Sequence, residues 1–435
     1  MDWGDMMDSR QKITILDFGG QYNQLIARRV REMGVYCEIL PHSKPVGEWK
    51  DASLKGVILT GTLGAEAKKI EDALIKDSVP VMSIVDGRDF RPSAGEDNEG
   101  MNALKAFVTE GCKCQSNYKI EDQIDRMIQE VKDQVGDGKV IAALSGGVDS
   151  SVCAVLASKA LRKDQLICVF VDHGFMRKDE PKQVVETYRD KLGLNLIHID
   201  GEARFLKACE GVTDPEQKRK IIGETFIRVF EEEARKINAQ FLLQGTIYPD
   251  ILESGIDGKK SVKSHHNVGG LPKESLFSKE QLVEPVKYLF KNEVRELGTY
   301  LGIPREMLWR QPFPGPGLAV RCIGLLLKER LDLLRECDYI FRDEIAQAGL
   351  AEKIWQYFTI MTGVKTVGVH GEDRTYAECI ALRAVNTEDA MTADVIELPY
   401  EVLFKTMNRI IRENPGVNRV VYDITQKPPG TIEWE

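Results

Sequence analysis

The stretch Lys139–Ala160, KVIAALSGGVDSSVCAVLASKA, is the part of the sequence around which the rest is organised. It begins with a short apolar run, Val140 to Leu144, which is typical of a buried parallel strand. A turn of small residues follows, and residues 152–160 then predict a helix. Glycines let backbone N–H groups approach an anion, and the N-terminus of a helix carries partial positive charge. This strand–turn–helix unit therefore predicts a phosphate-binding site.

The seven residues of the turn each have an expected part in that site. We expect the pyrophosphate end of ATP to be bound by Ser145, Gly146, Gly147, Val148, Asp149, Ser150 and Ser151. The serines supply hydroxyl donors, whereas the carboxylate of Asp149 suits the Mg²⁺ that accompanies ATP. The alternative is a tight turn whose Asp and Ser only cap a helix. The complete heptapeptide after a buried strand favours phosphate binding.

The turn differs from the GxxxxGK[ST] loop because no lysine follows its glycines. It resembles the pyrophosphate loop of the N-type ATP pyrophosphatases, enzymes that cleave ATP between the α and β phosphates. The resemblance implies a doubly wound, parallel α/β sheet. That family contains several ligases and also tRNA-modifying enzymes, and the loop alone does not choose among them.

Length and composition exclude several classes of protein. A chain of 435 residues is expected to form two or three domains. It has no run of about 18 apolar residues and no secretory signal, which predicts a cytoplasmic protein. The nine cysteines include no CxxC pair, which favours a reducing compartment and disfavours a zinc site. The net charge of −9 argues against general nucleic-acid binding.

Residues 1–115 have an open α/β pattern, with predicted strands at 12–17, 35–40, 54–59 and 79–85. The stretch 17–32, DFGGQYNQLIARRVRE, resembles the opening of a class I glutamine amidotransferase domain. In that family the fourth strand leads into a nucleophile elbow, Gly-Ile-Cys-Tyr-Gly. Here residues 83–87 read SIVDG, so Val85 occupies the position of the catalytic thiolate. Valine cannot form a thioester, so the glutaminase nucleophile is missing.

The same segment is about half the length that the resemblance implies, and it has no His-x-Glu pair to complete a triad. Either the domain is naturally degenerate, leaving an enzyme that depends on free ammonia or on a separate glutaminase, or the sequence carries a deletion. Residues 104–114, LKAFVTEGCKC, are expected to form a linker to the next domain.

Residues 116–312 are expected to form the ATP pyrophosphatase domain. A predicted strand at 166–171 ends in Asp172, which should meet the adenosine because ligands bind beyond the carboxyl ends of parallel strands. The basic run 218–220 is interpreted as a solvated helix face, with contact to a phosphate as the alternative. Lys263 lies in a loop rich in Gly, Ser and His, residues 255–270, which is interpreted as a mobile lid with Lys263 as a catalytic residue.

Several motifs make the resemblance more specific. They are VTDPEQKRKIIG (212–223), QGTIYPD (244–250), KSHHNVGGLP (263–272) and RQPFPGPG (310–317). These motifs resemble the GMP synthase family. Residues 313–435, with a predicted helix at 328–349, several strands and a second helix at 400–413, resemble its α+β dimerisation domain. The resemblance implies that the C-terminal tail holds the nucleotide substrate through Lys427, Ile432 and Glu433, with Lys427 on its phosphate and Glu433 on the purine.

The resemblance implies a homodimeric ligase of purine biosynthesis with Mg²⁺ as cofactor. It would aminate xanthosine monophosphate (XMP) to GMP, through an adenylyl intermediate, with ATP and with ammonia or glutamine. No nucleic acid or membrane is expected as a partner. Two alternatives are a non-catalytic pseudoenzyme and a tRNA-modifying ATP pyrophosphatase. The first predicts a damaged pyrophosphate loop, and the second predicts a CxxC pair or a thiouridine-type domain; the sequence has none of these features.

Overall fold

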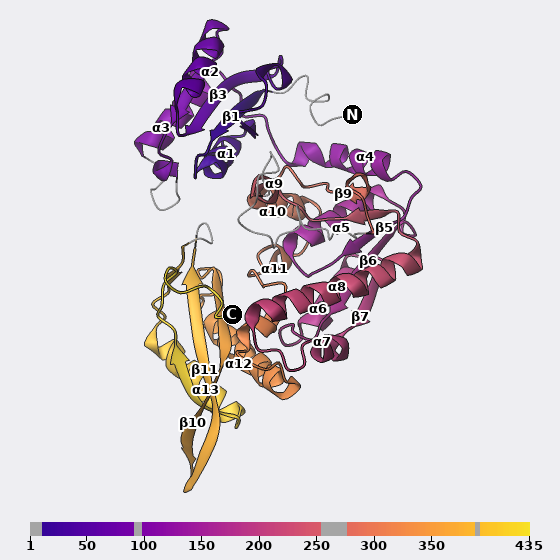
Figure 1. Ribbon diagram of the computed structural model, residues 1–435, viewed down its shortest axis with the longest axis vertical. Helices are drawn as coiled ribbons and strands as arrows, with labels where there is room; N and C mark the ends of the chain where they lie inside the picture. The colour runs from indigo at the N-terminus through magenta and orange to yellow at the C-terminus, as the bar shows by residue number, and fades with distance from the viewer. Residues whose placement is uncertain (1–10, 91–97, 254–275, 388–391) are drawn as a thin grey trace. The chain divides into compact units, whose positions relative to one another are not determined.

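The computed structural model describes residues 11–90, 98–253, 276–387 and 392–435 (Figure 1). Contacts divide the chain into two compact units. The first contains residues 1–126, 246–274 and 286–297, and the second contains residues 127–245, 275–285 and 298–435. The predicted division into 1–115, 116–312 and 313–435 stays a prediction.

The first unit contains a parallel four-stranded sheet in the order β2-β1-β3-β4. Its strands are β1 (Lys12–Phe18), β2 (Tyr36–Pro41), β3 (Leu54–Gly61) and β4 (Val81–Ile84). Helix α1 (Asn23–Glu32) connects β1 to β2, and α2 (Ala65–Lys76) connects β3 to β4. Ile13, Ile15 and Ile58 are fully buried in its core. The four predicted strands and the first helix are confirmed.

The expected linker at residues 104–114 is wrong. Helix α3 (Glu99–Ala106) continues into a π-helix (Phe107–Gly111), and Leu104, Val108 and Cys112 are buried in the same core as β1 and β2. The apolar residues of this segment are spaced at helical intervals, which predicts a packed helix. The residues GCK after them mark the end of that helix and not a flexible connection. Helix α9 (Tyr248–Glu253) also belongs to this unit, and α10 (Lys291–Tyr300) begins in it and ends in the second unit.

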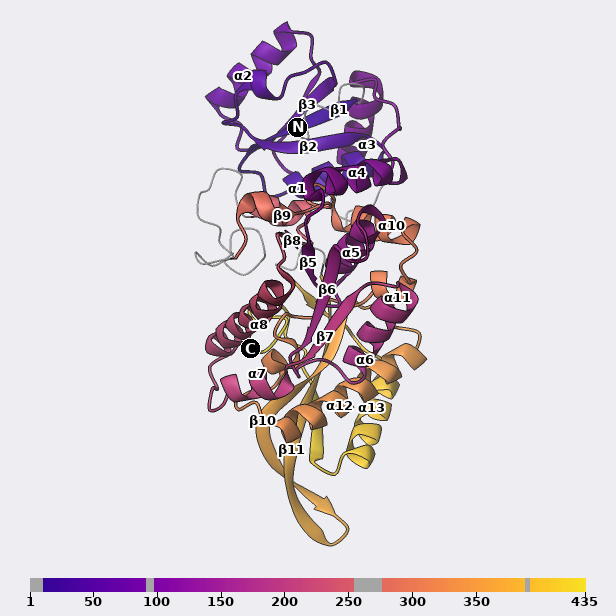
Figure 2. The ribbon, with the colours of Figure 1, turned by 90° about the vertical axis from the view of Figure 1, so that its right-hand side faces the viewer.

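The second unit is built on a parallel five-stranded sheet in the order β7-β6-β5-β8-β9. Its strands are β5 (Val140–Ala143), β6 (Leu166–Asp172), β7 (Leu196–Asp200), β8 (Phe241–Leu243) and β9 (Leu282–Val283). Its helices are α4 (Ile124–Val135, from residue 127), α5 (Val148–Ala160), α6 (Glu180–Val185), α7 (Glu202–Ala208), α8 (Pro215–Ile237) and α11 (Arg305–Leu308). Figure 2 shows α5 and α6 on one face of the sheet and α8 on the other, which confirms the doubly wound α/β prediction.

The strand order places a topological switch point between β5 and β8. From β5 the chain proceeds outward to β6 and β7, and it then returns to the opposite side of β5 to form β8. In open α/β sheets, ligands bind in the crevice at the carboxyl ends of the strands that flank such a point. The turn after β5 therefore lies at the position where a ligand is expected.

The C-terminal part of this unit is α+β, as predicted. Strands β10 (Gln356–His370) and β11 (Asp373–Asn386) form a long antiparallel hairpin, joined by β12 (Asp394–Val395) and by β13 (Val417–Tyr422). Helices α12 (Lys328–Gln347) and α13 (Tyr400–Glu413) pack against strands of this sheet, α12 against β10 and α13 against β13. Strand β10 has an irregularity in its register with β11 between Met361 and Lys365.

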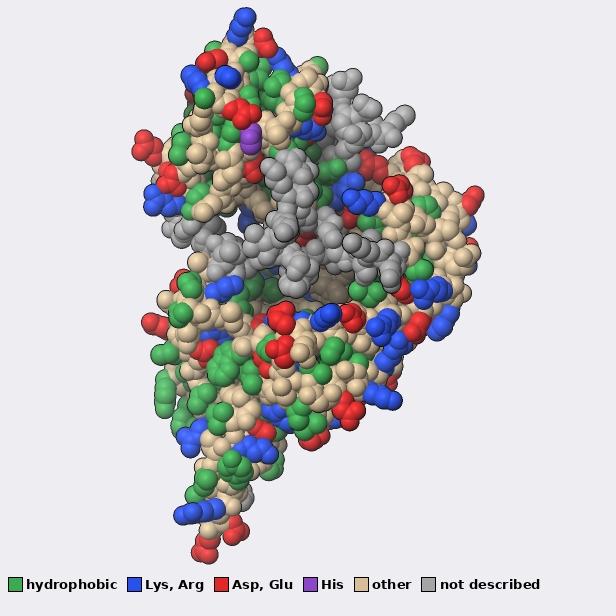
Figure 3. All heavy atoms as spheres, viewed as in Figure 1, with side chains coloured by type: hydrophobic (Ala, Val, Ile, Leu, Met, Phe, Trp, Pro, Cys, Tyr) green, Lys and Arg blue, Asp and Glu red, His purple; other side chains and the backbone are tan. Residues whose placement is uncertain are grey.

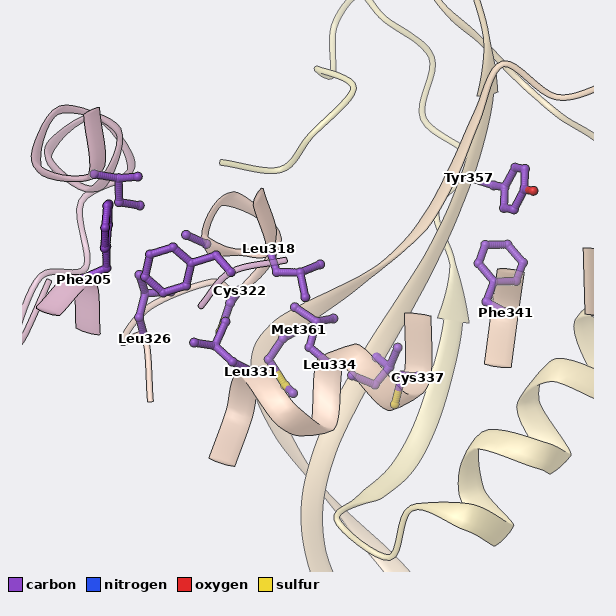
Figure 4. Packing of buried hydrophobic residues seen from close by; sticks show 14 of the residues in the cluster. Phe205, Leu318, Cys322, Leu326, Leu331, Leu334, Cys337, Phe341, Tyr357 and Met361 are labelled. Carbon is purple, nitrogen blue, oxygen red and sulfur yellow. The ribbon is translucent and has the colours of Figure 1, made fainter. Parts of the chain in front are cut away.

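Apolar side chains join α12 to this sheet in one core. Leu331, Leu334 and Cys337 of α12 are fully buried, as is Met361 of β10, and Figure 4 shows these side chains packed together. The cluster also includes Val169 of the parallel sheet, which is why the two parts belong to one compact unit. In the described part of the chain, no helix is both long enough and apolar enough to cross a membrane.

Candidate functional site

The turn after β5 has the geometry of an open anion cradle. Gly146 has a φ of +76°, which a residue with a side chain rarely adopts. Gly147 is the N-cap of α5, and its side-chain-free backbone leaves the N-terminus of this helix uncapped by a side chain. Ser145 and Gly147 are exposed, and Ser150 is half-buried. Backbone N–H groups at an uncapped helix N-terminus are suited to bind phosphate oxygens.

Two of the serines have different positions. The Ser150 hydroxyl donates to the Gly147 carbonyl at 3.1 Å and lies 3.4 Å from the exposed Ser145 hydroxyl. The Ser151 hydroxyl is buried, donates to the Gly147 carbonyl at 2.6 Å and lies 2.5 Å from the Tyr188 hydroxyl. These bonds hold the turn from beneath. Ser151 therefore supports the cradle, which the sequence pattern of three neighbouring serines could not distinguish from a direct contact.

Gly245, directly beyond β8, forms the opposite side of the crevice. A Cβ atom at this position would lie 2.9 Å from the backbone nitrogen of Ser150 and 3.0 Å from the carbonyl carbon of Asp149. The end of β8 and the start of α5 can approach this closely only because residue 245 has no side chain. Gly245 lies in the motif 244–250 but was not among the predicted site residues; a glycine just beyond a predicted strand was the signal available.

Asp149 is the acidic residue in the first turn of α5 and is half-buried. Among the described residues no group of three or more His, Cys, Asp and Glu side chains could hold a metal ion. A single carboxylate nevertheless fits Mg²⁺ in an ATP site, because Mg²⁺ is commonly held by one or two carboxylates together with substrate phosphates and water. The residues present are compatible with Mg²⁺ that arrives with ATP.

Asp172 ends β6, the neighbour of β5, as the sequence predicts. Its Oδ1 accepts a hydrogen bond from the Gly174 N–H at 2.9 Å, and burial raises the pKa of the carboxyl. The side chain is thus fixed beside the crevice.

The C-terminal tail is bound into the second unit by buried charges. Both carboxylate oxygens of Glu433 accept hydrogen bonds from Arg321, at 2.8 and 2.9 Å, and Arg321 is fully buried. The guanidinium of Arg383, also fully buried, donates to the carbonyls of Ile432 and Thr431 at 2.8 and 2.7 Å. The tail is therefore a built structure and not a frayed end. A charged residue inside the apolar run at 318–326 was the available signal for Arg321.

Lys218 corrects the interpretation of 218–220 as a solvated helix face. Its ammonium is fully buried, donates to the Cys322 carbonyl at 2.8 Å and pairs with the side chain of Glu435. The neighbouring Arg219 donates to the backbone carbonyl of Glu435. Helix α8 therefore contributes two cations that hold the end of the chain.

Lys427 and Ile432 occupy different parts of the tail. The backbone of Lys427 exchanges two hydrogen bonds with that of Ala393, at 2.9 and 3.0 Å. Ile432 packs against Phe358 and Ile360 of β10. Lys263 and the loop at 255–270 lie outside the described residues.

Comparisons with known proteins agree with this architecture. Residues 343–434 match the model of the GMP synthase C-terminal domain, and residues 119–224 match that of NAD synthase. The chain is 43% identical over 517 residues to a GMP synthase [glutamine-hydrolyzing] of Symbiobacterium thermophilum, covering 99% of this chain and all of that protein. It is 44% identical over 513 residues to the one of Clostridium botulinum strain Kyoto, covering 98% of this chain and all of that protein. The chain belongs to the GMP synthase family.

Membership of the GMP synthase family makes the chain an enzyme, a ligase that uses ATP, and does not favour the pseudoenzyme or tRNA-modifying alternatives. A solved structure of NMN synthetase from Francisella tularensis is also similar, with 18% identity and a TM-score of 0.34, over 46% of this chain and 78% of that one.

The first unit contains the segment that resembles a class I glutamine amidotransferase domain. Val85 directly follows β4, with 75% of its surface exposed. Gly87 lies so close to Tyr22 that a Cβ atom would be 2.3 Å from the tyrosine Cβ. Gly87 thus packs against Tyr22, and an exposed valine stands where the resemblance expects the nucleophile. The alignment with the S. thermophilum protein extends over 517 residues, whereas this chain has 435, so part of that relative has no counterpart here.

Proposed function

We propose that this chain converts XMP to GMP with ATP and free ammonia, releasing AMP and pyrophosphate. The observation that carries the proposal is the open cradle at the switch point, where the uncapped start of α5 meets Gly245. This crevice suits the pyrophosphate of ATP, because the backbone N–H groups and the helix dipole act on the same anion.

In the first step, the 2-oxo group of XMP attacks the α-phosphorus of ATP, and the bond to the α–β bridging oxygen breaks. The leaving pyrophosphate takes the electron pair of that bond. Residues 145–150 hold it through N–H and hydroxyl donors, and Asp149 would hold the accompanying Mg²⁺. When bound, Mg²⁺ would neutralise charge on the phosphate oxygens. Asp172 positions the adenosine, and Lys263 stabilises the transferring group. No protein nucleophile is needed, so the residues act by positioning and electrostatics.

In the second step, ammonia attacks C2 of the adenylated purine, and AMP leaves with the former 2-oxo oxygen. Lys427 holds the substrate phosphate. Glu433 accepts hydrogen bonds from the purine, and Ile432 packs beside it. The bidentate pair of Glu433 with Arg321 supports this role, because it fixes the position of the carboxylate oxygens.

Ammonia is the proposed nitrogen source because the glutaminase nucleophile is replaced by Val85. This chain is also shorter than its alignments with relatives named glutamine-hydrolyzing, which supports the same conclusion. Free ammonia, or ammonia from a separate glutaminase, then substitutes for an internal supply.

We also propose that two copies associate through the hairpin of β10 and β11. Val367 and Val369 of β10 are 59% and 76% exposed, and Tyr376, opposite Val367 on β11, is 70% exposed. Tyr400 and Phe404 of α13 are also exposed, and hydrophobic side chains gather over this part in Figure 3. Apolar surface of this kind favours a protein interface. Sedimentation velocity should show a dimer that Val369→Lys weakens and the distant Asp164→Lys leaves intact.

The deciding experiment measures GMP formation from XMP and Mg-ATP, with ammonium in one reaction and glutamine in the other. We expect GMP and one equivalent of pyrophosphate with ammonium, and no GMP with glutamine. Product with glutamine, in a preparation cleared of contaminating glutaminase, would overturn the ammonia proposal. No product in either reaction would overturn the proposed function.

A further inference from the structure

A second cationic pocket lies in the same compact unit, apart from the residues assigned above. It has a volume of about 260 Å³. Its basic lining residues are Arg177, Lys178, Arg310 and Arg342. The rings of Tyr339 and Tyr357 line it as well. The pocket thus combines residues that follow β6 with residues of α12 and β10.

Most charges around the pocket are already paired. Glu180 forms an ion pair with Arg310 and accepts a hydrogen bond from the backbone of Arg177 at 2.8 Å. Lys178 pairs with Glu336 at 2.6 Å. The carboxylate of Asp343, which also lines the pocket, pairs with Arg409. Glu180 thus pairs with a cation of the pocket itself, Asp343 pairs with Arg409, and Asp338 lies 3.9 Å from Arg342. Asp179 is the third acidic residue of the lining.

The side chain of Arg177 is the exception. It is only 3% exposed, and its Nε and Nη2 atoms have no hydrogen-bond partner within the described parts of the chain. The guanidinium stacks on Phe313, with its central carbon 4.3 Å from the ring centroid. Stacking leaves the N–H groups in the guanidinium plane unused. Buried N–H donors of a cation without hydrogen-bond partners are costly, so this arrangement fits a site completed by an anionic ligand.

The charges around Arg177 also favour an anionic ligand. Burial lowers the pKa of Arg177 well below its usual range, and nearby Arg342, Arg321 and Arg310 lower it further, with Asp338 opposing them. Such a cluster of like charges is stabilised by an oxyanion with more than one negative charge, since arginine forks bind phosphate oxygens in pairs.

Arg310 connects the pocket with the pyrophosphate cradle. Its Nη1 donates to the Gly146 carbonyl at 3.2 Å, and a Cβ atom on Gly146 would lie 2.8 Å from that nitrogen. One side chain therefore lines the pocket and contacts the turn that is proposed to hold the leaving group. The pocket borders the turn at Gly146.

We infer that this pocket is a second oxyanion site, which binds inorganic phosphate or pyrophosphate through Arg177 and Arg342. The inference rests on the proposed function only in that pyrophosphate is then a product formed beside it. Pyrophosphate released from the cradle would meet the cations of this pocket. We therefore expect the pocket to bind pyrophosphate more tightly than orthophosphate.

The test is calorimetric titration of the full-length chain with inorganic pyrophosphate, and separately with orthophosphate and with XMP, at constant ionic strength and without ATP. Wild-type protein should bind pyrophosphate at two sites. Arg177→Met should lose one site, and Arg342→Met should weaken the same site about tenfold, the effect of losing one charged hydrogen bond. Arg204→Met is the matched control, because Arg204 is exposed and paired with Glu232 far along the chain from the pocket residues.

Thermal melting distinguishes a ligand site from a structural role. If Arg177 serves a ligand, Arg177→Met should keep or raise the melting temperature without anion, and pyrophosphate should stabilise it less than it stabilises wild type. Equal binding by Arg177→Met, Arg342→Met and Arg204→Met would overturn the inference. Tighter binding of XMP than of pyrophosphate at the Arg177-dependent site would also overturn it and assign the pocket to the nucleotide phosphate. Because no turnover is measured, a failure here is separate from a failure to form GMP.

Discussion

At the scale of single residues, Ser151 supports the cradle from beneath. Ser151→Ala would remove the hydroxyl that bonds the Gly147 carbonyl and would leave the buried Tyr188 hydroxyl without this partner. We expect a loss of about 1–3 kcal/mol in stability, the cost of an unmatched buried polar group. Tyr188→Phe removes the other partner and should have a similar effect. Thermal melting measures the loss of stability, and the KM for ATP is measured on the same variants. A Ser151→Ala variant with the wild-type melting temperature and a raised KM would show that Ser151 contacts the ligand directly.

His173 gives the fold a predictable response to acid. Burial, helped by the nearby Arg335 cation, lowers the pKa of His173 to about 4, and its Nδ1 accepts from the Phe175 N–H at 3.0 Å. The unfolded chain has a histidine pKa near 6.5, so between about pH 6.5 and 4 the unfolded state binds the extra proton. Stability from this residue is therefore complete above about pH 6.5 and is lost as the pH falls toward 4.

Replacing His173 with asparagine tests that response. Asparagine keeps an acceptor for the Phe175 N–H and does not titrate. We expect wild type to lose about 1–3 kcal/mol of stability between pH 7 and pH 5, and His173→Asn to lose less over the same interval. Melting temperatures at the two pH values measure this. A variant with the full acid sensitivity of wild type would show that other groups cause it.

At the scale of elements, the approach of β8 to α5 makes the crevice. Gly245→Ala would push a methyl group against the backbone at Asp149 and Ser150. We expect activity with ammonium to fall about tenfold or more, because small displacements of positioning groups are costly. Gly223→Ala is the control, since Gly223 lies within α8 and its Cβ would meet no atom within 4 Å. That variant should be fully active and slightly more stable. Equal activity in both variants would contradict the prediction.

The elements were predictable where periodicity was strong. The strands predicted at 12–17, 35–40, 54–59, 79–85, 140–144 and 166–171 are present, because a run of Val, Ile and Leu has few alternatives when it is flanked by turn residues. The turn after β5 was also predictable, because small residues directly follow such an apolar run. The partners of these elements were not, because Arg321 with Glu433 and Lys218 with Glu435 are more than 100 residues apart in the chain. Such pairs depend on tertiary packing, which local pattern does not contain.

At the scale of the whole molecule, the amidotransferase-like segment belongs to a unit that includes later parts of the chain. Arg31 of α1 is buried, and its Nη1 lies 2.9 Å from the Glu293 carboxylate and 2.9 Å from the Tyr288 carbonyl. The Tyr248 hydroxyl accepts a hydrogen bond from the Ile39 N–H at 2.6 Å. The sequence resemblance suggested a degenerate module, whereas these contacts give it a structural role that does not need a nucleophile.

A chain shortened to begin at Lys119 should therefore be unstable, even though it keeps the cradle and the tail. It would expose Tyr248 and Phe290, each 4% exposed in the full chain, and would leave Glu293 without its buried cation. We expect aggregation of the shortened chain, and a full-length Glu293→Gln variant destabilised by about 3–5 kcal/mol, the cost of breaking a buried ion pair. Size-exclusion chromatography and thermal melting measure the two effects. A shortened chain that is monodisperse and makes GMP from ammonium at the full-length rate would show that the first unit is dispensable, and a destabilised Glu293→Gln variant would then reflect only the burial of one unpaired charge.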